Sequence, residues 1–282
     1  MKSGKTEAES VRVVERAIDL GINLIDTSGR NGTEGIIGRA VSSYDRSRLV
    51  LSTKALVSEG NSLQTAAQFS TSIERSLRNL GTNYVDIMHF HGVLPHEYEY
   101  AVTELLPVME KFQAAGKIRF IGITEQFERD RDHIMLQRAL DDDCWDIVMA
   151  GFNIVNQSAR ASVFTPARDK DVGVLGMFAV RRALTTSECF RQALAEIRSD
   201  GQLAPDFDID NVVAELTEEQ PIANIAYRYC RDETGIHSVL TGTGDIRHLE
   251  QNYTTFDQPP LTESTRRLID TTFAHVTNFS GN

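Results

Sequence analysis

Paired cysteines and metal-ligand spacings are missing from this sequence. The three cysteines form no CxxC pair and no zinc-ligand pattern: Cys144, Cys189 and Cys230. Disulfide frameworks and structural zinc sites need several suitably spaced cysteines, so reduced thiols in a cytosolic protein are the simplest interpretation. We therefore predict a cytoplasmic protein without a metal site.

The sequence also lacks a surplus of positive charge and any long hydrophobic run. Its 29 Lys and Arg residues face 40 Asp and Glu residues, for a formal net charge of -11. Affinity for nucleic acid or anionic lipid depends on clustered Lys and Arg, and a bilayer span needs roughly 20 apolar residues in succession. We therefore expect neither nucleic acid nor a membrane as a partner, whereas a small anionic cofactor is compatible with this charge.

What the sequence does contain is a regular alternation of short apolar runs with longer amphipathic stretches, which is typical of βα units. Strands are expected at 22–27, 48–54, 84–90, 118–123, 145–151, 173–179 and 237–241. Helices are expected at 6–20, 33–43, 62–79, 97–115, 128–141, 158–170, 220–232, 245–253 and 261–276. The 282 residues suffice for one α/β barrel domain of roughly 250 residues.

The predicted fold is therefore a (β/α)8 barrel over residues 1–282, with seven strands present and the N-terminal strand missing. Either the natural chain starts upstream of Met1 or the barrel is split, and we favour the first explanation. The longest connection, 182–219, is either a lid over the substrate or a solvated excursion with one helix near 187–198. Residues 254–282 are expected to form a C-terminal helix and tail.

Chemically active side chains stand at the ends of successive predicted strands. Asp26 lies in "NLIDTS", Lys54 ends "LVLSTK", His91 follows "VDIMHF" and Thr124 follows "RFIGI". In a parallel barrel these ends converge on one face, where such enzymes carry out their chemistry. Each residue also has a plainer interpretation: Asp26 could cap the following helix, and His89 on the same strand face as His91 is expected to be structural.

Five segments identify a family resemblance: "GINLIDTSGRNGTEGIIGRA", "LVLSTK", "SLRNLGTNYVDIMHFHG", "AGKIRFIGITE" and "SVLTGTGDIRHLEQN". In order and spacing they resemble the motifs of the aldo-keto reductases, over about residues 6–253. The resemblance implies an NAD(P)H-dependent carbonyl reductase without a metal. Such enzymes transfer a hydride from the nicotinamide to a carbonyl carbon, while the protein supplies position and electrostatic field.

The resemblance implies catalytic roles for an Asp, a Lys, a His and a Tyr. The first three are Asp26, Lys54 and His91, while the slot of the proton-donating Tyr holds Asn31. An amide donates a hydrogen bond but has no proton to release, so we expect weakened reductase activity. His91 itself, a water held by Lys54 or a side chain from 182–219 are the candidate substitutes.

Cofactor contacts transfer less evenly. Thr124 matches a residue that binds the nicotinamide carboxamide, and Glu125 stands where Asn is frequent. The position where the family commonly has Gln holds Met149, and Asn153 and Asn156 lie close by. The position of the aromatic residue that stacks on the nicotinamide ring holds Met177, and Phe178 follows it. At the adenine end the candidates are Gly242, Thr243, Gly244, Arg247, His248, Gln251 and Asn252. The glycines could also be simple turn residues.

NADPH is the preferred cofactor, with NADH as the alternative. Two functions stay open: an oxidoreductase that reduces an aldehyde or ketone to an alcohol, and a catalytically decayed nicotinamide-nucleotide-binding protein that acts as a sensor or partner. The expected partner is a small carbonyl substrate, and the sequence makes no prediction about oligomeric state.

Overall fold

The computed structural model describes residues 6–60 and 62–282, and their contacts divide them into two compact units. Unit 1 runs to Gln126 and includes 141–148 and 242–251. Unit 2 comprises 127–140, 149–241 and 252–282. Within the described residues, no helix has the length and apolar character that a bilayer crossing demands.

Unit 1 is built on four parallel strands in the order β1 (Leu24–Asp26), β2 (Val50–Leu56), β5 (Val85–Val93) and β6 (Ile118–Glu125). Asp26 lies opposite Ser52, and Lys54 lies opposite His89. Most of β5 is buried, which is typical of a parallel strand covered on both faces. The register of β5 with β6 shifts between Phe90 and Val93, whereas His91, within this stretch, stays paired with Leu56 of β2.

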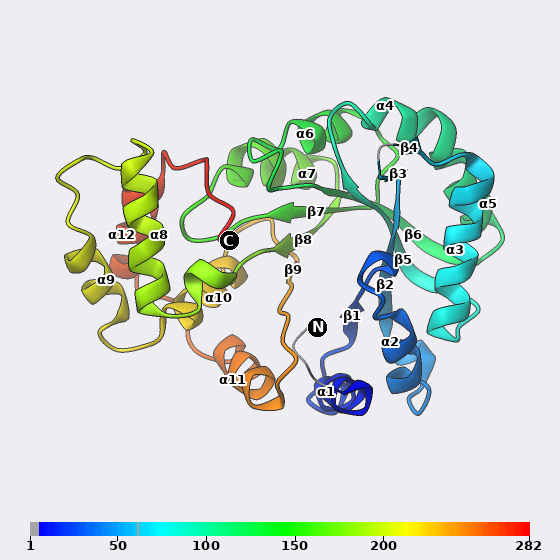
Figure 1. The fold of residues 1–282 in the computed structure, drawn as a ribbon, viewed down its shortest axis with the longest axis horizontal. Coiled ribbons are helices and arrows are strands. Elements are labelled where there is room, and N and C mark those ends of the chain that lie inside the picture. Colours follow the sequence, from blue (N-terminus) through cyan, green and yellow to red (C-terminus); the bar gives the residue numbers. More distant parts are fainter. Residues whose placement is uncertain (1–5, 61) are drawn as a thin grey trace. The chain divides into compact units, whose positions relative to one another are not determined.

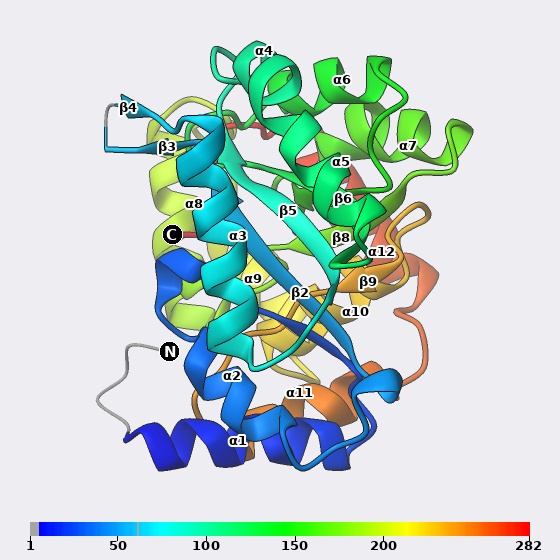
Figure 2. The same ribbon diagram turned by 90° about the vertical axis from the view of Figure 1, so that its right-hand side faces the viewer.

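Helices cover these strands. In chain order they are α1 (Glu7–Asp19), the 3-10 turn η1 (Gly29–Asn31), α2 (Glu34–Val41), η2 (Arg46–Arg48), α3 (Ala66–Leu80), α4 (Tyr98–Tyr100), the π-helical η3 (Ala101–Leu105) and α5 (Leu106–Ala114). Helix α3 packs against β2, and α5 packs against β6 (Figure 2). A short hairpin, β3 (Ser58–Glu59) and β4 (Ser62–Leu63), was not predicted.

Local sequence explains where the covering helices begin and end. Thr6 and Glu9 form a capping box at α1, and Thr65 and Gln68 form one at α3. These side chains satisfy backbone N–H groups that have no partner inside the helix. Helix α3 ends at Gly81, whose φ of 62° lies in the left-handed region that glycine adopts without steric cost. The same helix helps to form the core, because Phe69 stacks on Phe90 at 5.1 Å.

Unit 2 carries the other three strands of the series, β7 (Ile147–Gly151), β8 (Gly173–Met177) and β9 (Ser238–Val239), with β7 beginning in unit 1. Its remaining elements are α6 (Ile134–Asp141), η4 (Arg160–Phe164), α7 (Thr165–Asp169), η5 (Arg182–Leu184), α8 (Ser187–Ser199), α9 (Ile209–Thr217), α10 (Ile222–Arg231) and α12 (Glu263–Phe273). Helix α11 (Ile246–Phe256) begins in unit 1 and ends in unit 2 (Figure 1).

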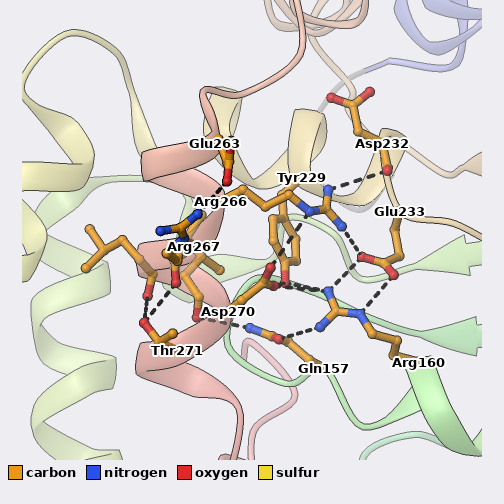
Figure 3. A network of polar contacts seen from close by, with 12 residues as sticks. Gln157, Arg160, Tyr229, Asp232, Glu233, Glu263, Arg266, Arg267, Asp270 and Thr271 are labelled. Carbon is orange, nitrogen blue, oxygen red and sulfur yellow. Dashed lines mark hydrogen bonds and ion pairs between the residues drawn. The ribbon is translucent and has the colours of Figure 1, made fainter.

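A charged network fastens α12 within unit 2 (Figure 3). Arg160 of η4 binds Glu233 at 2.7 Å and the Tyr229 hydroxyl at 2.8 Å. Arg266 of α12 binds the same Glu233 carboxylate at 2.6 Å. Because the Glu233 side chain is only 4% exposed, its charge depends on these two guanidinium groups.

Two helix predictions need correction. The helix expected over 128–141 begins only at Ile134, because the Asp130 carboxylate accepts the N–H groups of Ile134 and Met135 at 2.9 and 2.8 Å. His133, just before it, has a φ of 57°, which a helix cannot continue through. The connection 182–219 contains the expected helix as α8 but also a second one, α9, which Asp208 caps.

Candidate active site

A buried ion pair joins the ends of β1 and β2. The Lys54 ammonium donates to Asp26 Oδ1 at 2.6 Å, to Oδ2 at 2.5 Å and to the Thr27 carbonyl at 2.9 Å. Ser52 donates to the same carboxylate at 2.7 Å. The side chains of Lys54 and Asp26 are only 7% and 19% exposed, so solvent screens this pair weakly.

The ion pair uses the full donor capacity of Lys54. An ammonium group has three N–H donors, and three acceptors lie within 2.9 Å of this one. This arrangement argues against a catalytic water held by Lys54. Asp26 is not the cap of the following turn η1, because the side chain that caps this turn is that of Ser28.

Two histidines of β5 lie within the electric field of Lys54. The Lys54 charge and burial lower the pKa of both imidazoles, with burial the larger cause, and bring that of His91 to about 4. His91 is therefore a neutral imidazole at pH 7, which donates a hydrogen bond through its ring N–H but is not an acid. This finding argues against His91 as the replacement proton donor.

The side chain of His89 is more deeply buried than that of His91. As predicted, it has a packing role. It is fully buried, and within the described part of the chain neither ring nitrogen has a hydrogen-bond partner. Its ring lies against Gly122 of β6, where an added Cβ would come within 2.3 Å of Nδ1. Only glycine leaves room for this ring on the neighbouring strand.

The residue in the Tyr slot lies on the exposed turn η1. Asn31 ends this turn, and its backbone N–H is held by the Ser28 carbonyl at 3.1 Å. Its neighbour Arg30 is also exposed, and the Arg30 charge further lowers the pKa of His91. Arg30 was not predicted as a site residue, although its position next to Asn31 in the sequence is a signal that could have pointed to it.

At the end of β6, Thr124 already has one partner. Its hydroxyl oxygen accepts the N–H of Gly92 at 2.7 Å, so the hydroxyl proton is still available to an acceptor such as a carboxamide oxygen. Thr124 and Glu125 are only 2% and 3% exposed. The side chain next to His91 is thus fixed before any ligand arrives.

The start of α11 combines open backbone with exposed cations. Arg247 and His248 are exposed, and a Cβ built on Gly242 would meet no atom within 4 Å. Two amides are already satisfied, however: Asp245 N–H by Thr243 Oγ1 at 3.0 Å, and Arg247 N–H by Asp245 Oδ1 at 2.9 Å. A phosphate would therefore depend on the Arg247 and His248 side chains more than on the helix amides that the sequence suggested.

Four residues predicted to contact the cofactor belong to unit 2: Asn153, Asn156, Phe178 and Asn252. Asn153 is fully buried, and its Oδ1 accepts two backbone N–H groups. Among residues 6–60 and 62–282, its Nδ2 has no hydrogen-bond partner. An unpaired buried amide of this kind fits a carbonyl acceptor on a ligand. Asn156, by contrast, is occupied by the carbonyls of Thr277 and Phe279, and Asn252 binds the Thr241 hydroxyl at 2.8 Å.

Phe178 presents only part of its ring for stacking. The Arg181 guanidinium lies 4.2 Å from the centroid of the Phe178 ring, and Phe127 lies 5.9 Å away at a tilt. Its φ of 68° is unusual for a side chain of this size. The described residues contain no cluster of three His, Cys, Asp or Glu side chains placed to hold a metal ion.

A comparison of the sequence with protein-family models identifies the family of the chain. The family model described as "Aldo/keto reductase family" matches residues 2–272. The chain belongs to the aldo-keto reductases. It is an oxidoreductase by family, and the family acts on small carbonyl substrates.

Known relatives of this aldo-keto reductase span most of the chain. It is 28% identical to L-galactose dehydrogenase of Arabidopsis thaliana over 256 residues, which are 87% of this chain and 77% of that protein. The fold is similar to the holo form of aldo-keto reductase AKR11C1 from Bacillus halodurans, with a TM-score of 0.73, 21% identity, and coverage of 99% and 92% of the two chains. An NADPH complex of an aldo-keto reductase from Klebsiella pneumoniae gives a TM-score of 0.66 at 23% identity, with coverage of 95% and 85%. The predicted (β/α)8 fold class is thereby confirmed.

Proposed function

We propose that the protein reduces an aldehyde or ketone to an alcohol by hydride transfer from NAD(P)H, with NADPH preferred. The observation that carries this proposal is the buried Asp26–Lys54 ion pair with the neutral His91 in its field. The family membership and the NADPH complex of the Klebsiella relative support it. The free thiols of Cys144, Cys189 and Cys230 support the cytoplasmic location that we also propose.

The residues present fit a nicotinamide nucleotide. Within unit 1, the Thr124 hydroxyl would hold the carboxamide, and Arg247 and His248 would hold a ribose phosphate. When bound, the nicotinamide supplies the hydride. We also propose that Gln251 and Asn252 contact the adenine of the nucleotide.

The chain's own residues would then manage charge on the carbonyl oxygen. The neutral His91 donates its ring N–H to this oxygen, and the fixed Lys54 ammonium favours the negative charge that develops there. Asn31 adds a hydrogen bond but no proton. The proton must then come from solvent, and loss of general-acid help lowers the rate by roughly 10²–10⁴-fold.

A second function has its own supporting observation. Asn31 has no acidic proton, His91 is neutral, and Lys54 has all its donors engaged. This combination favours a protein that binds a nicotinamide nucleotide without turning it over, as a sensor or as a partner of another protein.

One experiment separates the two functions. Purified protein is titrated with NADPH and with NADH while the nicotinamide fluorescence is followed, and a panel of aldehydes and ketones is then added. Oxidation of the cofactor supports the reductase, binding without oxidation supports the second function, and no binding contradicts both. Lys54→Met should abolish turnover, whereas Lys111→Met on α5 should not.

A further inference from the structure

The cations of the candidate site differ in how far their charge is compensated. Lys54 is paired with Asp26 at 2.5 Å, so together they carry no net charge. Arg30 is exposed, and among the described residues no carboxylate lies within ion-pair distance of its guanidinium. In a protein with a net charge of -11, an uncompensated arginine beside the candidate catalytic residues creates a local positive potential that attracts an anion.

The backbone under Arg30 is firmly placed. Turn η1 packs against β2, the strand that carries Lys54. The residues that lead into the turn are buried, with Thr27 and Ser28 at 5% and 0% exposure. The Thr27 carbonyl binds Lys54 at 2.9 Å, and the Ser28 hydroxyl caps the turn. A short, anchored backbone therefore holds Arg30 close to the ion pair while its side chain stays open to a ligand.

Strand β2, against which η1 packs, pairs with β5 in a register that puts Leu56 opposite His91, so Arg30 and His91 belong to neighbouring parts of unit 1. The Arg30 charge is accordingly one of the three causes that lower the pKa of that imidazole. A ligand whose carbonyl oxygen binds His91 would thus extend toward an unpaired guanidinium. Next to Arg30, the exposed Asn31 amide offers a further hydrogen-bond donor.

We propose that the carbonyl substrate of this protein carries a carboxylate group, which the Arg30 guanidinium of η1 binds while its carbonyl oxygen lies at His91. This inference rests on the proposed function. A guanidinium forms two parallel hydrogen bonds with a carboxylate, a geometry that an ammonium cannot reproduce. One uncompensated cation balances a carboxylate, whereas a phosphate dianion would need a second, and Lys54 is already neutralised.

The test compares two substrates that differ by one charge: 4-oxobutanoate and its methyl ester. In the unmodified protein the acid should have the lower KM. In Arg30→Gln we expect the ratio of the two KM values, acid to ester, to rise about 10–100-fold, the range that one charge-assisted hydrogen-bond pair supports. Arg30→Lys should give an intermediate ratio. Arg12→Gln, which removes an exposed arginine of α1, should leave the ratio unchanged.

A binding measurement separates this inference from the proposed function. Succinate, which has no reducible carbonyl, is titrated calorimetrically into the NADPH-loaded protein and its Arg30→Gln variant. If no carbonyl is reduced but succinate binds through Arg30, the carboxylate site stands and the reductase proposal falls. If both substrates are reduced with equal KM in the unmodified protein, or if Arg30→Gln leaves the KM ratio unchanged, the reductase stands and the inference is wrong. Absence of both turnover and succinate binding contradicts the two together.

Discussion

We propose that Asn31 limits the activity of this aldo-keto reductase. A Tyr at this position would place a phenol near the Lys54 ammonium, which favours the phenolate and so makes the phenol a better proton donor. We expect Asn31→Tyr to raise kcat by roughly 10²–10⁴-fold with little change in NADPH affinity. Steady-state kinetics and fluorescence titration measure the two quantities. Asn31→Phe supplies the ring without the hydroxyl, so an equal gain in both variants would show that proton donation is not the cause.

His91 makes the stability of the fold depend on pH. Burial, Lys54 and Arg30 lower its pKa to about 4, whereas an unfolded chain has an ordinary imidazole near 6.5. Between these pH values the unfolded state binds more protons than the folded state. The contribution of the neutral His91 to the free energy of unfolding is therefore fully present above about pH 6.5 and is lost as the pH falls through 4. Between pH 7 and 4.5, the free energy of unfolding of His91→Asn should fall by about 2 kcal/mol less than that of the unmodified protein, as measured by urea unfolding. An equal pH dependence in both proteins would contradict the assigned pKa.

At the scale of secondary-structure elements, helices α2 and α3 of unit 1 approach each other closely. A Cβ added to Gly38 of α2 would come within 2.6 Å of the Asn79 carbonyl oxygen, which belongs to backbone and cannot swing away. Gly→Ala in a helix usually stabilises by about 1 kcal/mol, but Gly38→Ala should destabilise by about 1–3 kcal/mol through overpacking. Gly35→Ala is the matched control, since its nearest atom is the flexible end of Arg39 at 3.9 Å, and it should stabilise. Urea unfolding of both variants decides, and a stabilised Gly38→Ala would mean that the two helices separate easily.

At the same scale, sequence patterns located the strands and most helices because alternation and capping are local signals. These patterns failed where a specific contact determines the structure. The Asp130 carboxylate binds the backbone N–H groups of Ile134 and Met135, so α6 begins later than predicted. His133 has a left-handed backbone conformation, which the sequence does not indicate because the residue is not glycine. In the site, the family resemblance placed Asp26 and Lys54 at neighbouring strand ends. The engagement of all Lys54 donors and the field of Arg30 depend on distances in space, so no one-dimensional pattern contained them.

For the molecule as a whole, cofactor binding should appear as thermal stabilisation. Because the net charge of -11 repels a nucleotide that carries several negative charges, binding needs local cations such as Arg247, whose side chain is 84% exposed. At a concentration of about 100 times Kd, a ligand of the folded state adds about 2.7 kcal/mol, which for a chain of this size raises Tm by a few degrees.

Arg247→Gln tells the two nucleotides apart in the same thermal assay. If Arg247 meets the ribose phosphate that only NADPH has, this variant should reduce the Tm shift with NADPH and leave the shift with NADH intact. Arg12→Gln, on α1, should change neither. Equal losses for both nucleotides would remove Arg247 from the phosphate site and with it the reason to prefer NADPH. A shift with neither nucleotide in the unmodified protein would contradict nucleotide binding itself, because a ligand that binds only the folded state must raise Tm.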